Sequence, residues 1–117
     1  MKYLLLCQVQ PAAMADIPPA AGAQMMHDMT EYNHQLIQAG VLVAGGQLAP
    51  ADTAQRVFAS NGRIKTEEGF GLPGDTQIGG YYLIDVAGEP EATGWAAKCP
   101  IAKFGALEVR RVAYSPI

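Results

Sequence analysis

The sequence has few charged residues and no long hydrophobic run. Of its 117 residues, 16% are charged and 50% are hydrophobic. This balance excludes an intrinsically disordered chain, which combines low hydrophobicity with high charge. The net charge of −3 and the lack of a basic cluster argue against nucleic acid as a partner. No segment approaches the ~20 apolar residues of a membrane span, so no membrane association is expected.

Cysteine is also scarce. Cys7 and Cys99 show no C-x-x-C spacing, so the sequence supports neither a metal site nor a disulfide, and each is expected to be a buried thiol. The apolar start MKYLLLCQV is short and lacks a small-residue cleavage site. It therefore predicts a first strand rather than a signal peptide, and a cytoplasmic location.

The stretch GFGLPG at 69–74 matches the letters of the phosphate-binding pattern G-x-G-x-x-G. That pattern works only where the glycines follow a strand and open a helix. Here a strand, IGGYYLIDV, comes next instead of a helix, and Pro73 lacks the N–H that a phosphate cradle would use. The stretch therefore predicts a loop, and neither a nucleotide nor another cofactor is expected.

We expect a single domain over residues 1–117, built from alternating strands and helices. The helix after Pro19 has one apolar stripe and ends at Gly40, and Asn61-Gly62 is suited to a two-residue hairpin turn. The expected elements are a strand at 2–9, a helix at 20–39, a strand at 41–48, a hairpin at about 56–67, a strand at 81–86, a helix at 89–100 and a strand at 106–114.

Without the hairpin, this order is β-α-β-β-α-β, the ferredoxin-like α+β arrangement, in which both helices pack on one face of an antiparallel sheet. Runs such as LLLC and YYLI are apolar on both faces of their strands, whereas a strand with one face in water should alternate. Something must cover the second face, and a second copy of the chain is the simplest cover. The sequence therefore predicts a homodimer.

Several blocks together resemble the YCII-related family, specifically its DGPF branch: MKYLLL, EYNHQLIQAGVL, GGQLAP, IGGYYLIDV, GWAAKCP and LEVRRV. The resemblance covers nearly the whole chain and implies a dimeric α/β barrel, in which two sheets pack face to face. The chain departs from the family at the signature itself, because Glu68-Gly69-Phe70-Gly71 stands where the family reads Asp-Gly-Pro-Phe.

The other branch of the family is similar to small enzymes proposed to use a histidine and an aspartate as an acid/base pair. Counted back from Gly40, the histidine's place is taken by Met29, and the aspartate's approximate counterpart is Asp52. The chain's own His27 and His34 are about 10 Å apart along their helix, too far to share one metal ion. They are expected to lie on a solvated polar face.

A small molecule could enter such a dimer at an end of the sheet, where loops converge. We predict Asp52 and Glu68 as catalytic acids there, and one tyrosine of the pair Tyr81 and Tyr82, which point to opposite faces, as a ligand-binding group. An acid in an apolar strand, such as Asp85, could be a tuned general base, but at a strand end it is expected to cap the turn into the next helix, near Ala87-Gly88. The methionines are expected to fill the core rather than line a ligand site.

Two function classes follow. The first is a small-molecule enzyme with acid/base chemistry, or a ligand-binding protein, with a pocket at the sheet end. The second is a non-catalytic homodimeric interaction or regulatory module, consistent with the missing histidine. The sequence leaves both open, because the ferredoxin-like fold hosts many unrelated activities.

Overall fold

The computed structural model describes residues 1–70 and 74–116, so part of the 69–74 loop lies outside the described residues. A four-stranded antiparallel sheet has the order β2-β5-β1-β6, and a separate hairpin pairs β3 with β4. The elements are β1 (Lys2–Val9), α1 (Pro11–Ala15), α2 (Pro19–Gln38), β2 (Leu42–Gln47), η1 (Ala51–Thr53), β3 (Gln55–Ser60), β4 (Arg63–Glu68), β5 (Gln77–Asp85), α3 (Glu89–Lys98), η2 (Pro100–Lys103) and β6 (Ala106–Arg111). The ferredoxin-like α+β fold predicted from the sequence is confirmed.

Strand β1 organises the sheet because it pairs on both edges, with β5 on one side and β6 on the other. Its burial alternates: Tyr3, Leu5 and Cys7 are buried, and the residues between them are only partly buried. Leu5 lies opposite Tyr82 of β5 and Val109 of β6. Core side chains from three strands therefore meet on one face of the sheet.

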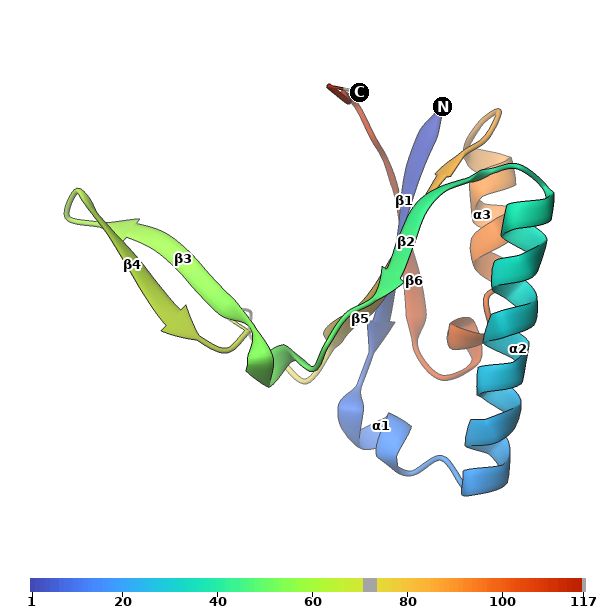
Figure 1. The fold of residues 1–117 in the computed structure, drawn as a ribbon, viewed down its shortest axis with the longest axis horizontal. Helices are drawn as coiled ribbons and strands as arrows, with labels where there is room; N and C mark the ends of the chain where they lie inside the picture. Colours follow the sequence, from blue (N-terminus) through green and yellow to red (C-terminus); the bar gives the residue numbers. More distant parts are fainter. Residues whose placement is uncertain (71–73, 117) are drawn as a thin grey trace.

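Helices α2 and α3 cover that face (Figure 1). Tyr32 joins α2 to α3, because its hydroxyl donates to the carbonyl oxygen of Trp95 at 2.8 Å. Its ring also meets the rings of Tyr82 and Trp95 edge-on, at centroid distances of 5.5 and 6.3 Å. One turn further along α2, Leu36 is fully buried. These contacts fix α2 against both the sheet and α3.

The opposite face of the sheet, which we call the helix-free face, carries Leu4, Leu6, Tyr81 and Leu83. In the strand register Leu4 lies opposite Leu83, and Leu6 lies opposite Tyr81. All four side chains are only partly buried, because α2 and α3 lie on the other side of the sheet. The face is therefore apolar along its two central strands, as the sequence predicts.

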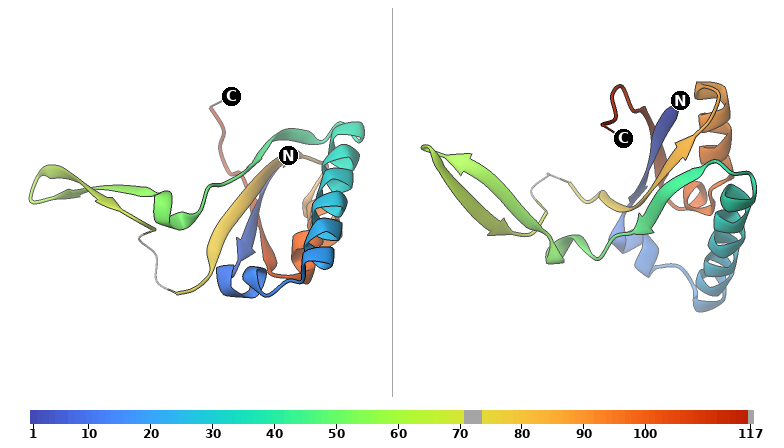
Figure 2. Two further views of the ribbon diagram at one scale, coloured as in Figure 1. Left: turned by 60° about the horizontal axis from the view of Figure 1, so that its bottom comes forward. Right: turned by 45° about the horizontal axis from the view of Figure 1, so that its top comes forward.

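Strands β3 and β4 form an arm, residues 55–68, that projects away from the side of the sheet occupied by α2 and α3 (Figures 1 and 2). Its turn has φ of 51° at Asn61 and 76° at Gly62, so the predicted hairpin is confirmed. The radius of gyration is 16.1 Å, compared with about 13 Å for a compact chain of this size. The chain is therefore extended by its arm.

Several elements differ from expectation. Strand β5 begins at Gln77 rather than at residue 81, and the short helices η1 and η2 were not predicted. Helix α1 was not predicted, because a five-residue Ala-rich segment between prolines has no room for a helical stripe. Strand β6 ends at Arg111 rather than at residue 114, since its partner strand begins at Lys2 and the last backbone bond runs from Val112 N–H to the Lys2 carbonyl oxygen.

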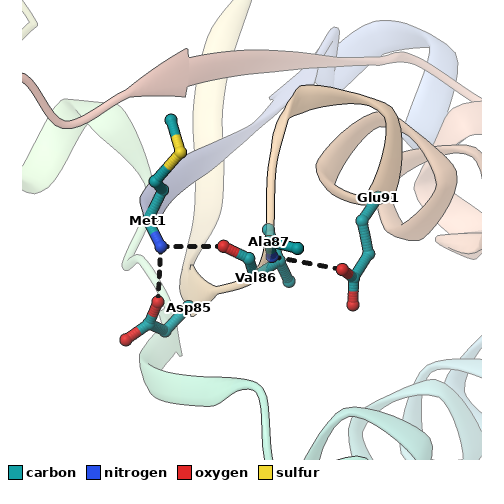
Figure 3. A network of polar contacts seen from close by, with 5 residues as sticks. All are labelled: Met1, Asp85, Val86, Ala87 and Glu91. Atoms are coloured by element: carbon teal, nitrogen blue, oxygen red, sulfur yellow. Dashed lines mark hydrogen bonds and ion pairs between the residues drawn. The ribbon is translucent and has the colours of Figure 1, made fainter.

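The expectation that Asp85 caps the turn into α3 is wrong. Its carboxylate accepts a hydrogen bond from the amino group of Met1 at 2.9 Å, and this ion pair lowers the pKa of the Asp85 carboxyl group. Glu91 caps the turn instead, because its carboxylate accepts a hydrogen bond from the backbone N–H of Ala87 at 3.2 Å (Figure 3). Asp85 therefore joins β1 to β5.

Among the described residues, no helix is long and apolar enough to cross a membrane.

Candidate ligand cavity

A cavity of about 880 Å³ opens between α2, α1 and one end of the sheet. It lies where β1 and β2 end and β5 begins, so side chains from several elements converge on it. Its volume falls within the roughly 300–1,000 Å³ of small-molecule sites. The side of the cavity formed by β1, β2 and the chain after β2 includes Cys7, Val9, Leu42, Gly45, Gly46, Leu48 and Pro50.

The helical wall of the cavity is rich in sulfur. Met14 of α1 and Met25, Met26 and Met29 of α2 all line it. Met25 and Met29 also pack against the buried core, as expected for core filling, while Met26 is 62% exposed. Because methionine is unbranched and flexible, this wall adapts to the shape of a bound molecule. Met25 and Met29 therefore fill the core as predicted, and they also line the cavity.

Two glycines allow strands β2 and β5 to lie close together in the cavity wall. A Cβ atom added to Gly45 would lie 3.0 Å from Cδ1 of Tyr82, and one added to Gly80 would lie 3.0 Å from the carbonyl oxygen of Gly46. The first of these contacts would displace an aromatic ring and the second a backbone atom. The absence of side chains here lets β2 and β5 pair closely beside Tyr82.

Tyr82 and Asn33 form a polar pair in the cavity wall. The Tyr82 hydroxyl donates a hydrogen bond to Oδ1 of Asn33, and both residues line the cavity. Burial raises the pKa of the Tyr82 phenol, so it is uncharged at neutral pH. Tyr81 faces the other side of the strand, as the sequence predicts, although some of its atoms also contribute to the lining.

Cys7 lies on the β1 side of the cavity, next to Cys99. Both are buried free thiols, as predicted. A hydrogen bond between the two thiols and burial raise the pKa of Cys7, so it stays protonated at neutral pH. Cys7 therefore presents a neutral, weakly polar surface to the cavity rather than a nucleophilic thiolate.

The predicted acids lie outside the cavity wall. Asp52 is exposed in η1, and Glu68 is exposed at the end of β4, opposite Gln55 in the hairpin register. They thus lie near the base of the arm, close in sequence to Pro50 at the cavity edge. Their catalytic role stays a prediction. His27 and His34 are exposed on α2, on the solvated face expected for them.

The described lining of the cavity holds no Asp, Glu, Lys, Arg or His. Met29, which takes the sequence position expected for the histidine of the other branch, is one of the lining residues. The titratable side chains in the wall are Cys7, Tyr81 and Tyr82, and the raised pKa values of Cys7 and Tyr82 keep both protonated at neutral pH. The chemistry of the wall suits the binding of an apolar molecule. Methionines clustered on one helix were the signal in the sequence that could have identified it.

No curated protein matches the chain. Among solved structures, the chain is similar to 5-chloro-2-hydroxyhydroquinone dehydrochlorinase from Burkholderia phenoliruptrix AC1100, determined in complex with 2,5-dihydroxybenzoquinone. The TM-score is 0.56 and the identity 15%, over 98% of this chain and 96% of that chain, so the likeness concerns the fold. The model of the YCII-related domain matches residues 1–114. The chain therefore belongs to the YCII-related family.

Proposed function

We propose that this protein binds a small apolar molecule in the cavity beside α2, and that it does so as a homodimer. The observation that carries the proposal is the 880 Å³ cavity, whose wall combines methionines and aliphatic side chains with the single fixed polar pair of Tyr82 and Asn33. Cavities of this size and polarity are typical of ligand sites. Each CH₂ group that a ligand buries there contributes about 0.8 kcal/mol.

The homodimer would form through the helix-free face. Leu4, Leu6, Tyr81 and Leu83 give that face an apolar centre. The arm projects toward the same side, where a second copy would stand (Figures 1 and 2). Because an isolated two-stranded hairpin is only marginally stable in water, the arm also favours a partner that packs against it.

The catalytic version of this function assigns Asp52 and Glu68 to acid/base chemistry at the mouth of the cavity. Both carboxylates are exposed, which favours ordinary surface charge over a tuned catalytic group. We therefore expect Asp52→Asn and Glu68→Gln to leave ligand affinity unchanged. Loss of turnover of a bound compound in either variant would instead favour the enzyme.

A cavity-filling variant tests the proposed function. Met25 lines the cavity, and Ala23 is exposed on the same helix outside the lining. Met25→Trp should abolish the binding of naphthalene-sized apolar probes, measured by calorimetry, while Ala23→Trp should bind them as the parent protein does. Equal binding by both variants would place the probes elsewhere on the molecule and overturn the proposal.

The alternative is a non-catalytic homodimeric interaction or regulatory module. The two uncovered apolar surfaces, on the sheet and on the arm, are the observations that favour it. A stable dimer that binds no small apolar molecule at millimolar concentration would support this function instead.

The cytoplasmic location expected from the sequence stays a prediction.

A further inference from the structure

We infer that the ligand of this cavity is uncharged and presents an oxygen acceptor to the side-chain amide of Asn33. The inference rests on the proposed ligand-binding function and narrows it to a chemical class: apolar ketones, esters, ethers or quinones, in preference to carboxylic acids, phosphates or amines. Two observations carry it, the neutrality of the wall and the direction of the hydrogen bond between Tyr82 and Asn33.

The neutrality of the wall selects against ions. The described lining offers an ionic ligand no opposite charge; its polar side chains are hydroxyls, amides and one thiol. An ion that enters loses its hydration, and burial of an unpaired charge is strongly unfavourable. A neutral molecule of the same shape avoids this penalty. Charge is therefore the first property by which the cavity discriminates.

The hydrogen bond between Tyr82 and Asn33 determines which polar group remains for the ligand. Tyr82 has one O–H, and it is donated to Oδ1 of Asn33. The amide nitrogen of Asn33 keeps two N–H donors, for which no acceptor is found in the described part of the chain. No buried side-chain nitrogen or oxygen lacks a partner there, so these donors are reachable from outside.

The other polar groups of the wall are less well placed. Tyr81 faces the helix-free side of its strand. The hydroxyl of Thr30 already donates to the carbonyl oxygen of Met26 at 3.0 Å. Gln47 is exposed at the end of β2, and Gln77 is partly exposed at the start of β5. Asn33 differs from both glutamines because Tyr82 holds its amide in one orientation. A ligand acceptor therefore finds its preorganised donor at Asn33.

Three naphthalene probes of similar shape test the inference by calorimetry: 2-acetylnaphthalene, 2-isopropenylnaphthalene and 2-naphthoate. The ketone should bind tightest. The hydrocarbon, which lacks the oxygen, should bind about 3- to 10-fold more weakly, as for the loss of one hydrogen bond. The naphthoate anion should bind at least about 10-fold more weakly than the ketone, because its charge stays unpaired.

Variants of Asn33 test whether its side-chain amide causes the tighter binding of the ketone. Asn33→Leu should make the affinities for ketone and hydrocarbon equal. Asn33→Asp is nearly isosteric: it keeps an oxygen that accepts from the Tyr82 hydroxyl, and it removes the N–H donors. This variant should therefore keep the fold and lose the preference for the ketone. Gln35→Leu, which removes an exposed amide of α2 outside the cavity lining, should leave the preference intact.

The outcomes separate this inference from the function on which it rests. Naphthoate that binds as tightly as the ketone would overturn the claim that the ligand is uncharged. Equal affinity for ketone and hydrocarbon in the parent protein, or an unchanged preference in Asn33→Asp, would overturn the role of Asn33. If none of the three probes binds, the ligand-binding function itself fails.

Discussion

The arm gives the most quantitative prediction, because one of its faces is apolar and uncovered. Ile64 lies opposite Ala59, and their face also carries Val57; Ile64 is 73% exposed. Full burial of an isoleucine side chain stabilises by about 1.5–3 kcal/mol. If a partner covers the exposed three quarters of it, each arm contributes about 1–2 kcal/mol, and the two arms of a symmetric dimer contribute about 2–4 kcal/mol.

Ile64→Ser should therefore raise the dimer dissociation constant by about 30- to 1,000-fold, measured by analytical ultracentrifugation over a concentration series. Lys65→Ser is the matched control, because Lys65 lies opposite Phe58 on the other face of the same hairpin. An unchanged dissociation constant in Ile64→Ser would refute the packing of the arm on a second copy. A parent protein that is monomeric at all concentrations would refute the homodimer itself.

Three further predictions concern stability and reactivity. Leu36→Ala, at a fully buried position, should lower the free energy of unfolding by about 2–5 kcal/mol in urea, whereas Ile37→Ala, 62% exposed, should change it by less than about 1 kcal/mol; equal losses would contradict the burial. The ion pair of Asp85 with the Met1 amino group lowers the carboxyl pKa from 3.8, so its stabilisation is present above about pH 4 and lost as pH falls through the lowered value. Asp85→Asn should remove this component from the pH dependence of the thermal midpoint, and an unaltered profile would count against the pair. Cys7, buried and with a raised pKa, should react with iodoacetamide only in urea; rapid labelling of the native protein, seen by mass spectrometry, would contradict its protonated state.

Most of the fold follows from local patterns in the sequence. The apolar stripe that ends at Gly40 and the Asn61-Gly62 turn are decided within a few residues, so the helix and the hairpin could be placed accurately. The bare face of the sheet followed from Leu4 and Leu6, which keep β1 apolar on both sides. These features need no knowledge of distant contacts.

The cavity could not be predicted in the same way, because its wall forms from segments that are far apart in the chain. Parity gives opposite faces for Tyr81 and Tyr82, but only the packing of α2 on the sheet decides that Tyr82 meets Asn33. The sequence predicts these acids from their position near strand ends, whereas the tertiary fold leaves Asp52 and Glu68 exposed at the base of the arm.

The central position of β1 has a consequence for biosynthesis. Leu5 has its partners at positions 82 and 109, so the first strand to be made stays unpaired until β5 and β6 have been translated. At about 5–20 residues per second, the roughly 70 residues between β1 and β5 take about 4–14 s. During that interval an extended apolar strand is exposed on the nascent chain, and an exposed apolar strand of this kind is prone to aggregation.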